Sequence, residues 1–316
     1  MGRDIVLIHG MWSRPEVLEP LRRHLAGCGH RVFAPALPGH DQENPPEADW
    51  LGKISIAEYV ESVERFIDDK KLESPPILIG HSMGGLIAQL VASRRTVGAV
   101  VLMNSAGPAG VNHIYPTAAW TTLNVLAMPF FWRRTHRPSF RRARYGLFNR
   151  VPAERTREIH ESLVPESGRC FFEVVFWFLD PKGTTRVAPE TLAAPILILS
   201  GGKDRIIKGA VAEKLSRLYP ATDTRYYPDN GHWFCEESGR DRIFADIETW
   251  IDDRPARLTE TPDPTRGSIP TSHHEVSRLP PVRPTGFPAA QPLGLRRFLD
   301  GARRVRRRPR ENAPPD

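Results

Sequence analysis

A serine in a turn between a strand and a helix is the clearest chemical feature of the sequence. Ser82 stands in Gly80-His81-Ser82-Met83-Gly84, which follows the apolar run Ile77–Ile79 and precedes a helix-forming segment. This G-x-S-x-G pattern is typical of a nucleophilic serine on a tight turn, because the small residues on either side let the backbone bend sharply. The alternative is that Ser82 only caps the following helix. We favour the nucleophile, since both flanking elements are the ones that the pattern requires.

A serine hydroxyl needs a base to accept its proton and an acid to orient that base. Asp204 and His232 each follow a later strand, in that order along the chain. The carboxyl ends of parallel strands meet at one edge of a sheet, so both side chains are expected beside Ser82. The strand that ends near Asn104 is followed by no carboxylate. The sequence therefore predicts a triad of Ser82, His232 and Asp204.

Backbone N–H groups at the same edge would stabilise the negative oxygen that forms when a serine attacks a carbonyl. Met83, directly after the serine, is predicted to supply one donor. Met11, in the turn after the first strand, is predicted to supply the second. Gly10 and Trp12, on either side of Met11, and Trp233, directly after His232, are predicted to contact the substrate.

Two other histidines near these motifs are interpreted as structural. His81, inside the serine turn, is expected to pack beside Ser82 without transferring a proton. His9 is expected to shape the turn that carries Met11 rather than to act as a base.

Strands and helices alternate over much of the chain, which indicates an α/β fold with a mostly parallel sheet of about six strands and helices on both faces. Short apolar runs predict strands at 5–9, 31–34, 76–80, 97–104, 195–200 and 224–227. Amphipathic periodicity predicts helices at 15–26, 56–71, 83–93, 209–218 and 240–251. We assign residues 1–106 and 191–252 to this core domain.

The regular alternation lapses between residues 107 and 190, which predicts a helical insert that caps the site. The insert is rich in large apolar side chains, and residues 133–157 hold nine Arg against one acid, Glu154. An apolar cap would suit an apolar acyl or aromatic substrate. The aromatic residues could instead serve to pack the insert onto the core, and the arginines could form a solvated face.

Residues 253–316 have a different composition from the rest of the chain. They hold 13 Arg, no Lys, 12 Pro and seven acids, and so carry six of the seven net positive charges. Such a segment buries too little apolar surface to fold, so we expect a disordered tail. Apolar residues between Leu295 and Val305 recur at helical spacing among arginines. Two interpretations stay open: a basic amphipathic helix that contacts a membrane surface, or a spacing that arose by chance. The nearly neutral body argues against nucleic-acid binding.

Composition also bears on membrane insertion, cellular location and cofactors. No apolar run approaches the ~20 residues of a membrane span, and the short run before His9 does not match a signal peptide. Cys28, Cys170 and Cys235 are far apart and odd in number, which excludes a disulfide scaffold and indicates a cytoplasmic location. With no phosphate-binding loop and no metal-ligand spacing, we expect no cofactor and no metal.

The motifs together resemble the α/β-hydrolase superfamily, in particular capped serine esterases and lipases. The matching segments span residues 4–252: the serine turn, Val6-Leu7-Ile8-His9-Gly10, Ala34-Pro35-Ala36-Leu37-Pro38-Gly39-His40, Gly201–Asp204 and Gly231-His232. Two features depart from the family pattern: the family's sheet usually begins with two further strands, which we do not expect here, and the usual Asp-x-x-Gly-x-Gly loop reads Ala36–His40. The resemblance implies an α/β-hydrolase fold but does not determine the substrate.

The residues and the resemblance together predict a serine hydrolase that cleaves a small apolar carboxylic ester through an acyl-enzyme. Ser82 argues against the epoxide hydrolases and haloalkane dehalogenases of this fold, which use an aspartate nucleophile. Three alternatives stay open: C–C bond hydrolysis, a cofactor-free lyase or oxygenase reaction with the same triad, and a non-catalytic ligand-binding protein.

Overall fold

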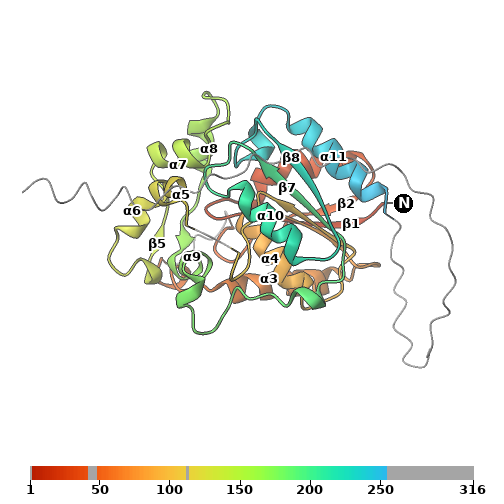
Figure 1. Ribbon diagram of the computed structural model, residues 1–316, viewed down its shortest axis with the longest axis horizontal. Helices are drawn as coiled ribbons and strands as arrows, with labels where there is room; N and C mark the ends of the chain where they lie inside the picture. The colour runs from red at the N-terminus through yellow and green to blue at the C-terminus, as the bar shows by residue number, and fades with distance from the viewer. Residues whose placement is uncertain (1, 42–47, 112–113, 255–316) are drawn as a thin grey trace, which may run out of the picture. The chain divides into compact units, whose positions relative to one another are not determined.

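A six-stranded parallel sheet lies at the centre of the computed structural model (Figure 1), which describes residues 2–41, 48–111 and 114–254. The strand order is β2-β1-β3-β4-β7-β8. The strands are β1 (Asp4–Ile8), β2 (Arg31–Phe33), β3 (Ile77–His81), β4 (Ala99–Met103), β7 (Ile196–Gly201) and β8 (Thr222–Tyr227). The predicted α/β class and the sheet of about six strands are confirmed.

Helices cover both faces of the sheet because alternate strand residues point to opposite sides. In β1, Ile5 and Leu7 pack with α1 (Glu19–Gly27) and α11 (Arg240–Asp252). Val6 and Ile8 belong to the other core, which holds α3 (Ile56–Lys70), α4 (Met83–Ala92) and α10 (Gly209–Leu218). Burial on both faces explains why the central strands read as continuous apolar runs.

Local residues determine where the helices begin. Ser55 caps α3: its hydroxyl accepts from the Ala57 N–H, and the Glu58 carboxylate accepts from the Ser55 N–H. The single helix expected from residue 15 is instead a 3-10 turn (Pro15–Leu18) followed by α1. Pro20 has no N–H and cannot make the bond to residue 16 that one continuous α-helix would need.

The insert between β4 and β7 is mostly short helices. It holds α5 (Pro116–Thr121), α6 (Leu123–Leu126), β5 (Thr135–His136), α7 (Phe140–Gly146), α8 (Thr156–Ser162), β6 (Glu166–Ser167) and α9 (Gly168–Val175). The antiparallel pair β5–β6 was not anticipated. Phe131, Phe148 and Phe171 pack with Trp12 and Trp233 from the core, so aromatic side chains attach the insert to the sheet domain.

A buried polar cluster also fixes the insert. Glu166, fully buried on β6, accepts hydrogen bonds from His40 Nε2 at 3.2 Å and from the Tyr59 hydroxyl at 2.6 Å. Ser167 donates to the Ile54 carbonyl at 2.6 Å. The short helix α2 (Ala48–Leu51) also contacts β5. Because His40, Tyr59 and Ile54 belong to the core, these bonds tie the two parts together.

The His40–Glu166 pair should make stability depend on pH. Burial opposes both charges, but their attraction and hydrogen bond outweigh it, so the pKa of His40 is raised and the pKa of Glu166 is lowered. The Glu166 carboxylate contributes its full stabilisation above pH 4.5, its pKa in the unfolded chain. This contribution is lost as the pH falls through the lower pKa that Glu166 has in the folded protein. The His40 imidazolium contributes its full stabilisation below pH 6.5, its pKa in the unfolded chain. This contribution is lost as the pH rises through the higher pKa that His40 has in the folded protein.

We therefore expect the pair to stabilise the protein most between pH 4.5 and 6.5. The control is a double variant, His40→Gln with Glu166→Gln, in which neither side chain titrates. Urea denaturation from about pH 5 to about pH 9 should show the wild type losing more unfolding free energy than the double variant. Parallel curves for the two proteins would contradict the prediction.

The predicted tail, apart from Asp253 and Arg254, lies outside the described residues. Among the described residues, we find no helix whose length and apolar character would allow it to cross a bilayer.

Candidate active site

Ser82 sits in a strained turn between β3 and α4. Its φ of 55° and ψ of −118° lie outside the regions that L-residues favour. Three backbone bonds hold the turn: the Ser82 N–H donates to Met103 O at 3.0 Å, and Ser82 O accepts from the N–H groups of Gly85 and Ala106 at 3.0 and 2.9 Å. The neighbouring strand and loop therefore hold the serine in this conformation.

Close backbone approach explains the glycines around Ser82. A Cβ on Gly84 would lie 2.1 Å from Ile8 O, and one on Gly80 would lie 2.2 Å from Gly84 O. A Cβ on Gly10 would lie 3.0 Å from the Ser82 Cβ, so the turn after β1 runs directly beside the serine. The small residues of the motif are required by contacts with β1 as well as by the bend itself.

A hydrogen-bond chain joins the three residues of the predicted triad. His232 Nε2 lies 3.1 Å from Ser82 Oγ, and His232 Nδ1 lies 2.7 Å from Asp204 Oδ2. The other carboxylate oxygen of Asp204 accepts from the N–H groups of Ile206 and Ile207 at 2.7 and 2.9 Å. A neutral His232 with its proton on Nδ1 fits this chain, since Nε2 is then free to accept the serine proton.

The His232 loop is positioned by two buried residues that no sequence motif indicated. Asn104, with a φ of 43°, donates its amide to Gly231 O at 2.9 Å and His232 O at 3.1 Å, and accepts from the Gly201 N–H at 2.8 Å. Glu237 accepts from the N–H groups of Gly231 and Trp233 at 2.6 and 3.0 Å. Burial raises the pKa of Glu237, although these donors favour its charged form. Both residues act on the backbone on either side of His232.

Asn104→Ala is expected to lower kcat for the reaction predicted at Ser82 by roughly ten- to a hundredfold with little change in KM, because it releases the loop that positions His232. The matched variant Asn104→Gly tolerates a positive φ but also lacks the amide. Both variants should lose activity alike in steady-state assays. Recovery of wild-type kcat in Asn104→Gly would show that backbone strain, not the amide, explains the loss.

The turn after β1 owes its shape to the insert and to His9. Trp12 has a φ of 59°; its carbonyl accepts from the Val164 N–H at 2.8 Å, and its indole N–H donates to His136 Nδ1 at 3.2 Å. His9 accepts from the Leu37 N–H at Nε2 and donates from Nδ1 to Gly10 O at 3.0 Å. Burial lowers the pKa of His9 to about 3, so it stays neutral and structural, as expected.

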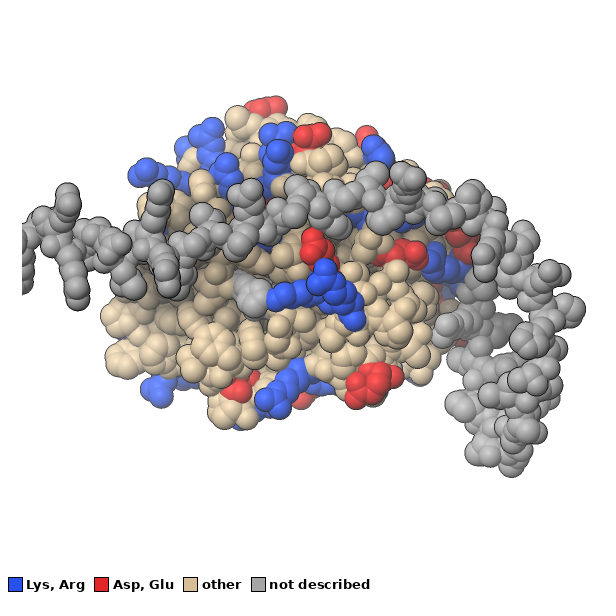
Figure 2. All heavy atoms as spheres, viewed as in Figure 1, with Lys and Arg blue, Asp and Glu red and all other residues tan. Residues whose placement is uncertain are grey.

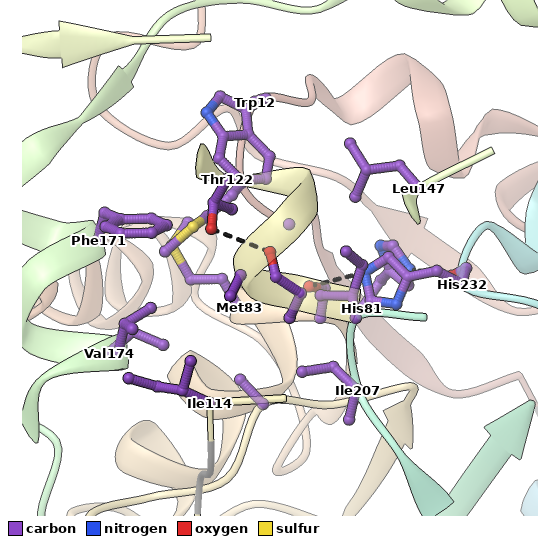
Figure 3. A pocket seen from close by; sticks show the side chains of 18 of the residues that line it. Trp12, His81, Met83, Ile114, Thr122, Leu147, Phe171, Val174, Ile207 and His232 are labelled. Carbon is purple, nitrogen blue, oxygen red and sulfur yellow. Dashed lines mark hydrogen bonds between the residues drawn. The ribbon is translucent and has the colours of Figure 1, made fainter. Parts of the chain in front are cut away.

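The cavity above Ser82 is apolar. Figure 3 shows Trp12, Met83 and Ile207 of the core together with the side chains that the insert contributes, which include Ile114, Thr122, Leu147, Phe171 and Val174. The Thr122 hydroxyl is engaged by the Ala118 carbonyl of its own segment at 3.0 Å. A ligand in this cavity would meet hydrocarbon on most sides and the Ser82–His232 pair at the bottom.

The predicted site residues lie together around this cavity. Its lining includes Ser82, Met83, His232 and the four residues predicted from the first turn and the last loop: Gly10, Met11, Trp12 and Trp233. Asp204 lies behind His232, fully enclosed. His81 bonds to His232 O at 2.8 Å through Nε2, and burial lowers its pKa to about 3, so it is unsuited to act as a base near neutral pH.

The outer surface of the insert is partly basic and partly apolar. Figure 2 shows the Lys and Arg side chains gathered over α7 and α8, whereas the surface over α6 and α9 is mostly uncharged. In the insert, Phe130, Trp132 and Phe178 are exposed, in contrast to the buried Phe131 and Phe171. The aromatic residues of the insert therefore divide between core packing and surface.

Within the part of the chain that the structure describes, the side chains close enough to share a metal ion are His24, Cys28 and Glu248, which lie on α1 and α11 and not in the cavity. Asp204 and His232 are already occupied by each other and by the serine. The cavity thus presents a serine, a histidine and apolar walls.

Comparison with known proteins agrees with this geometry. A model of the alpha/beta hydrolase family matches residues 5–246. The chain belongs to the alpha/beta hydrolase family. As a hydrolase of this family, the protein carries Ser82 at the turn where the motif expects the nucleophile.

Several known proteins are similar to this α/β hydrolase. The magnesium-chelatase 30 kDa subunit of Rhodobacter capsulatus is 24% identical over 79% of this chain and 87% of its own. Human monoglyceride lipase is 27% identical over 80% of this chain and 83% of its own. A solved methylesterase from Arabidopsis has a TM-score of 0.61 at 15% identity and covers 80% of this chain and 100% of its own, which shows the fold alone.

Proposed function

We propose that the protein is a serine hydrolase that cleaves carboxylic esters with an apolar acyl or aromatic group. The observation that carries this proposal is the hydrogen-bond chain from Ser82 through His232 to Asp204, which opens into an apolar cavity. A strained serine with a base at 3.1 Å is the arrangement that acyl transfer requires.

In the proposed reaction the Ser82 hydroxyl gives its proton to His232 Nε2 as Oγ attacks the ester carbonyl carbon. Asp204 stabilises the imidazolium, and the N–H groups of Met11 and Met83 donate to the carbonyl oxygen, which now carries the negative charge. His232 then gives the proton to the departing alkoxide, leaving an acyl-serine and an alcohol. Water, deprotonated by His232, attacks this acyl-serine and releases the carboxylic acid and the serine hydroxyl.

In this proposal residues 107–190 act as the cap over the site. The cavity walls from Ile114, Leu147 and Phe171 support this role, because they would exclude water and bind an apolar acyl chain. The similarity to monoglyceride lipase, a protein named for hydrolysis of an acylglycerol, favours the same bond class here. The small-molecule ester is thus the expected partner.

Hydrolysis of p-nitrophenyl esters from acetate to palmitate by the full chain tests the proposal. We expect turnover with an optimum at one chain length, which would measure the space under the cap. A folded protein that hydrolyses none of these esters would overturn the ester proposal and favour C–C hydrolysis, a lyase or oxygenase reaction, or ligand binding without turnover.

A further inference from the structure

Two helices far apart in sequence bring three metal-ligating side chains together. His24 and Cys28 lie four residues apart at the end of α1, so both side chains face the same side. Glu248 of α11 faces them, with its Oε2 2.9 Å from His24 Nε2. One ligand atom from each of the three residues lies within 4.8 Å of the other two.

The two helices that carry this cluster are packed together. Helices α1 and α11 pack side by side on one face of the sheet (Figure 1), and Leu21 and Leu25 of α1 share a buried core with Ile243 and Ile247 of α11. The His24 ring packs against Phe244 with 5.7 Å between ring centroids. Ligand side chains carried by packed helices are held in place before any ion arrives.

We propose that His24, Cys28 and Glu248 form a site for Zn²⁺ that fastens α1 to α11. Imidazole and thiolate together select borderline-soft ions such as Zn²⁺ over Mg²⁺ or Ca²⁺. A tetrahedral Zn²⁺ with bonds of about 2.0–2.3 Å holds its ligand atoms about 3.5 Å apart. In the structure the three ligand atoms lie within 4.8 Å of one another, and His24 Nε2 and Glu248 Oε2 are 2.9 Å apart.

A buried histidine lies beside the cluster. Asp252 lies one turn after Glu248 on α11, and His30 Nε2 lies 3.8 Å from Asp252 Oδ1. The His30 side chain is 2% exposed, and its Nδ1 accepts the Arg3 N–H, so the ring proton is on Nε2. Among the described residues this N–H has no hydrogen-bond partner.

The site is separate from the proposed catalytic centre. Cys28 lies just before β2, which starts at Arg31, so the cluster is at the amino-terminal edge of the sheet. Ser82 follows β3 at the carboxyl edge. Binding of Zn²⁺ at the cluster would therefore stabilise the packing of two helices without entering the reaction.

Titration of the chelator-treated full chain with Zn²⁺, against a chromophoric chelator, tests the proposal. We expect one Zn²⁺ per chain and a rise in Tm with added Zn²⁺. The variants Cys28→Ser, His24→Asn and Glu248→Gln should each weaken binding by about tenfold or more. The matched control Glu61→Gln, exposed on α3, should bind as the wild type does. Circular dichroism checks that all variants fold.

Substitution with Co²⁺ gives a second readout, because a thiolate ligand produces a near-ultraviolet charge-transfer band. This band should be present in the wild type and absent in Cys28→Ser. Failure of the wild type to bind Zn²⁺ would overturn the proposal. Undiminished affinity in Cys28→Ser would also overturn it and would place the ion elsewhere, for example at His273-His274 of the tail.

Discussion

Replacement of Ser82 by alanine is expected to lower kcat for p-nitrophenyl ester hydrolysis by roughly 10⁴-fold or more. The substitution removes the only atom that can form the acyl bond in the proposed reaction, while the apolar cavity and the backbone donors stay. KM, or the affinity for a non-hydrolysable analogue, should change little, because Ser82 contributes one polar atom to a mostly hydrocarbon surface. Steady-state kinetics at the optimal chain length measures both quantities.

Ser93→Ala is the matched control, since Ser93 ends the same helix, α4, whose N-cap is Ser82. Its hydroxyl bonds only locally, to Leu90 O at 2.8 Å, so kcat should stay at the wild-type value. Asp204→Asn keeps the serine but favours the His232 tautomer with its proton on Nε2, which cannot accept the serine proton. This variant should also lose most of its activity. Wild-type turnover in Ser82→Ala would show that the hydrolysis does not use this serine.

The positions that the sequence could predict are those whose chemistry depends on short local patterns. The serine turn needs glycines two residues before and after Ser82, and continuous apolar runs mark strands buried on both faces. From strand order alone, Asp204 and His232 were expected at one edge of a parallel sheet, and the structure brings both into hydrogen-bond contact with each other or with Ser82. Their catalytic roles stay part of the proposal.

The residues that escaped prediction act through contacts between distant segments. In the sequence, Asn104 only marks a strand end that lacks a carboxylate, yet in the structure its side chain joins the ends of β4 and β7 to the His232 loop. Trp12 takes its positive φ while bonded to Val164 and His136 of the insert. Neither contact follows a spacing rule, because the loops meet only after the sheet and the insert have packed.

The proposed metal site follows the same logic. No metal was expected from the sequence, because His24 and Cys28 are separated from Glu248 by most of the chain. On each helix the residues have ordinary surface character, and only the packing of α1 against α11 creates the cluster. Sequence signatures for metals detect ligands that are close along the chain, and a site shared by two helices leaves no such signature.

Gly84→Ala is expected to cost about 3 kcal/mol or more of unfolding free energy and to abolish turnover. The new Cβ would lie 2.1 Å from Ile8 O and 2.5 Å from His9 O. Both neighbours are backbone atoms of β1 and its following turn, so no side chain can swing aside. Helix α4 would have to move away from β1, and this movement would release the strain that holds Ser82 in place.

Gly27→Ala is the matched control, because it makes the same change at the last residue of α1, where a Cβ meets nothing within 4 Å. Alanine is favoured over glycine in a helix, so this variant should be unchanged or up to about 1 kcal/mol more stable. Urea denaturation of both variants, with metal removed, measures the difference. Equal stability of the two variants would mean that α4 can move from β1 at no cost, and the close packing of Gly84 would then not explain how the turn keeps Ser82 strained.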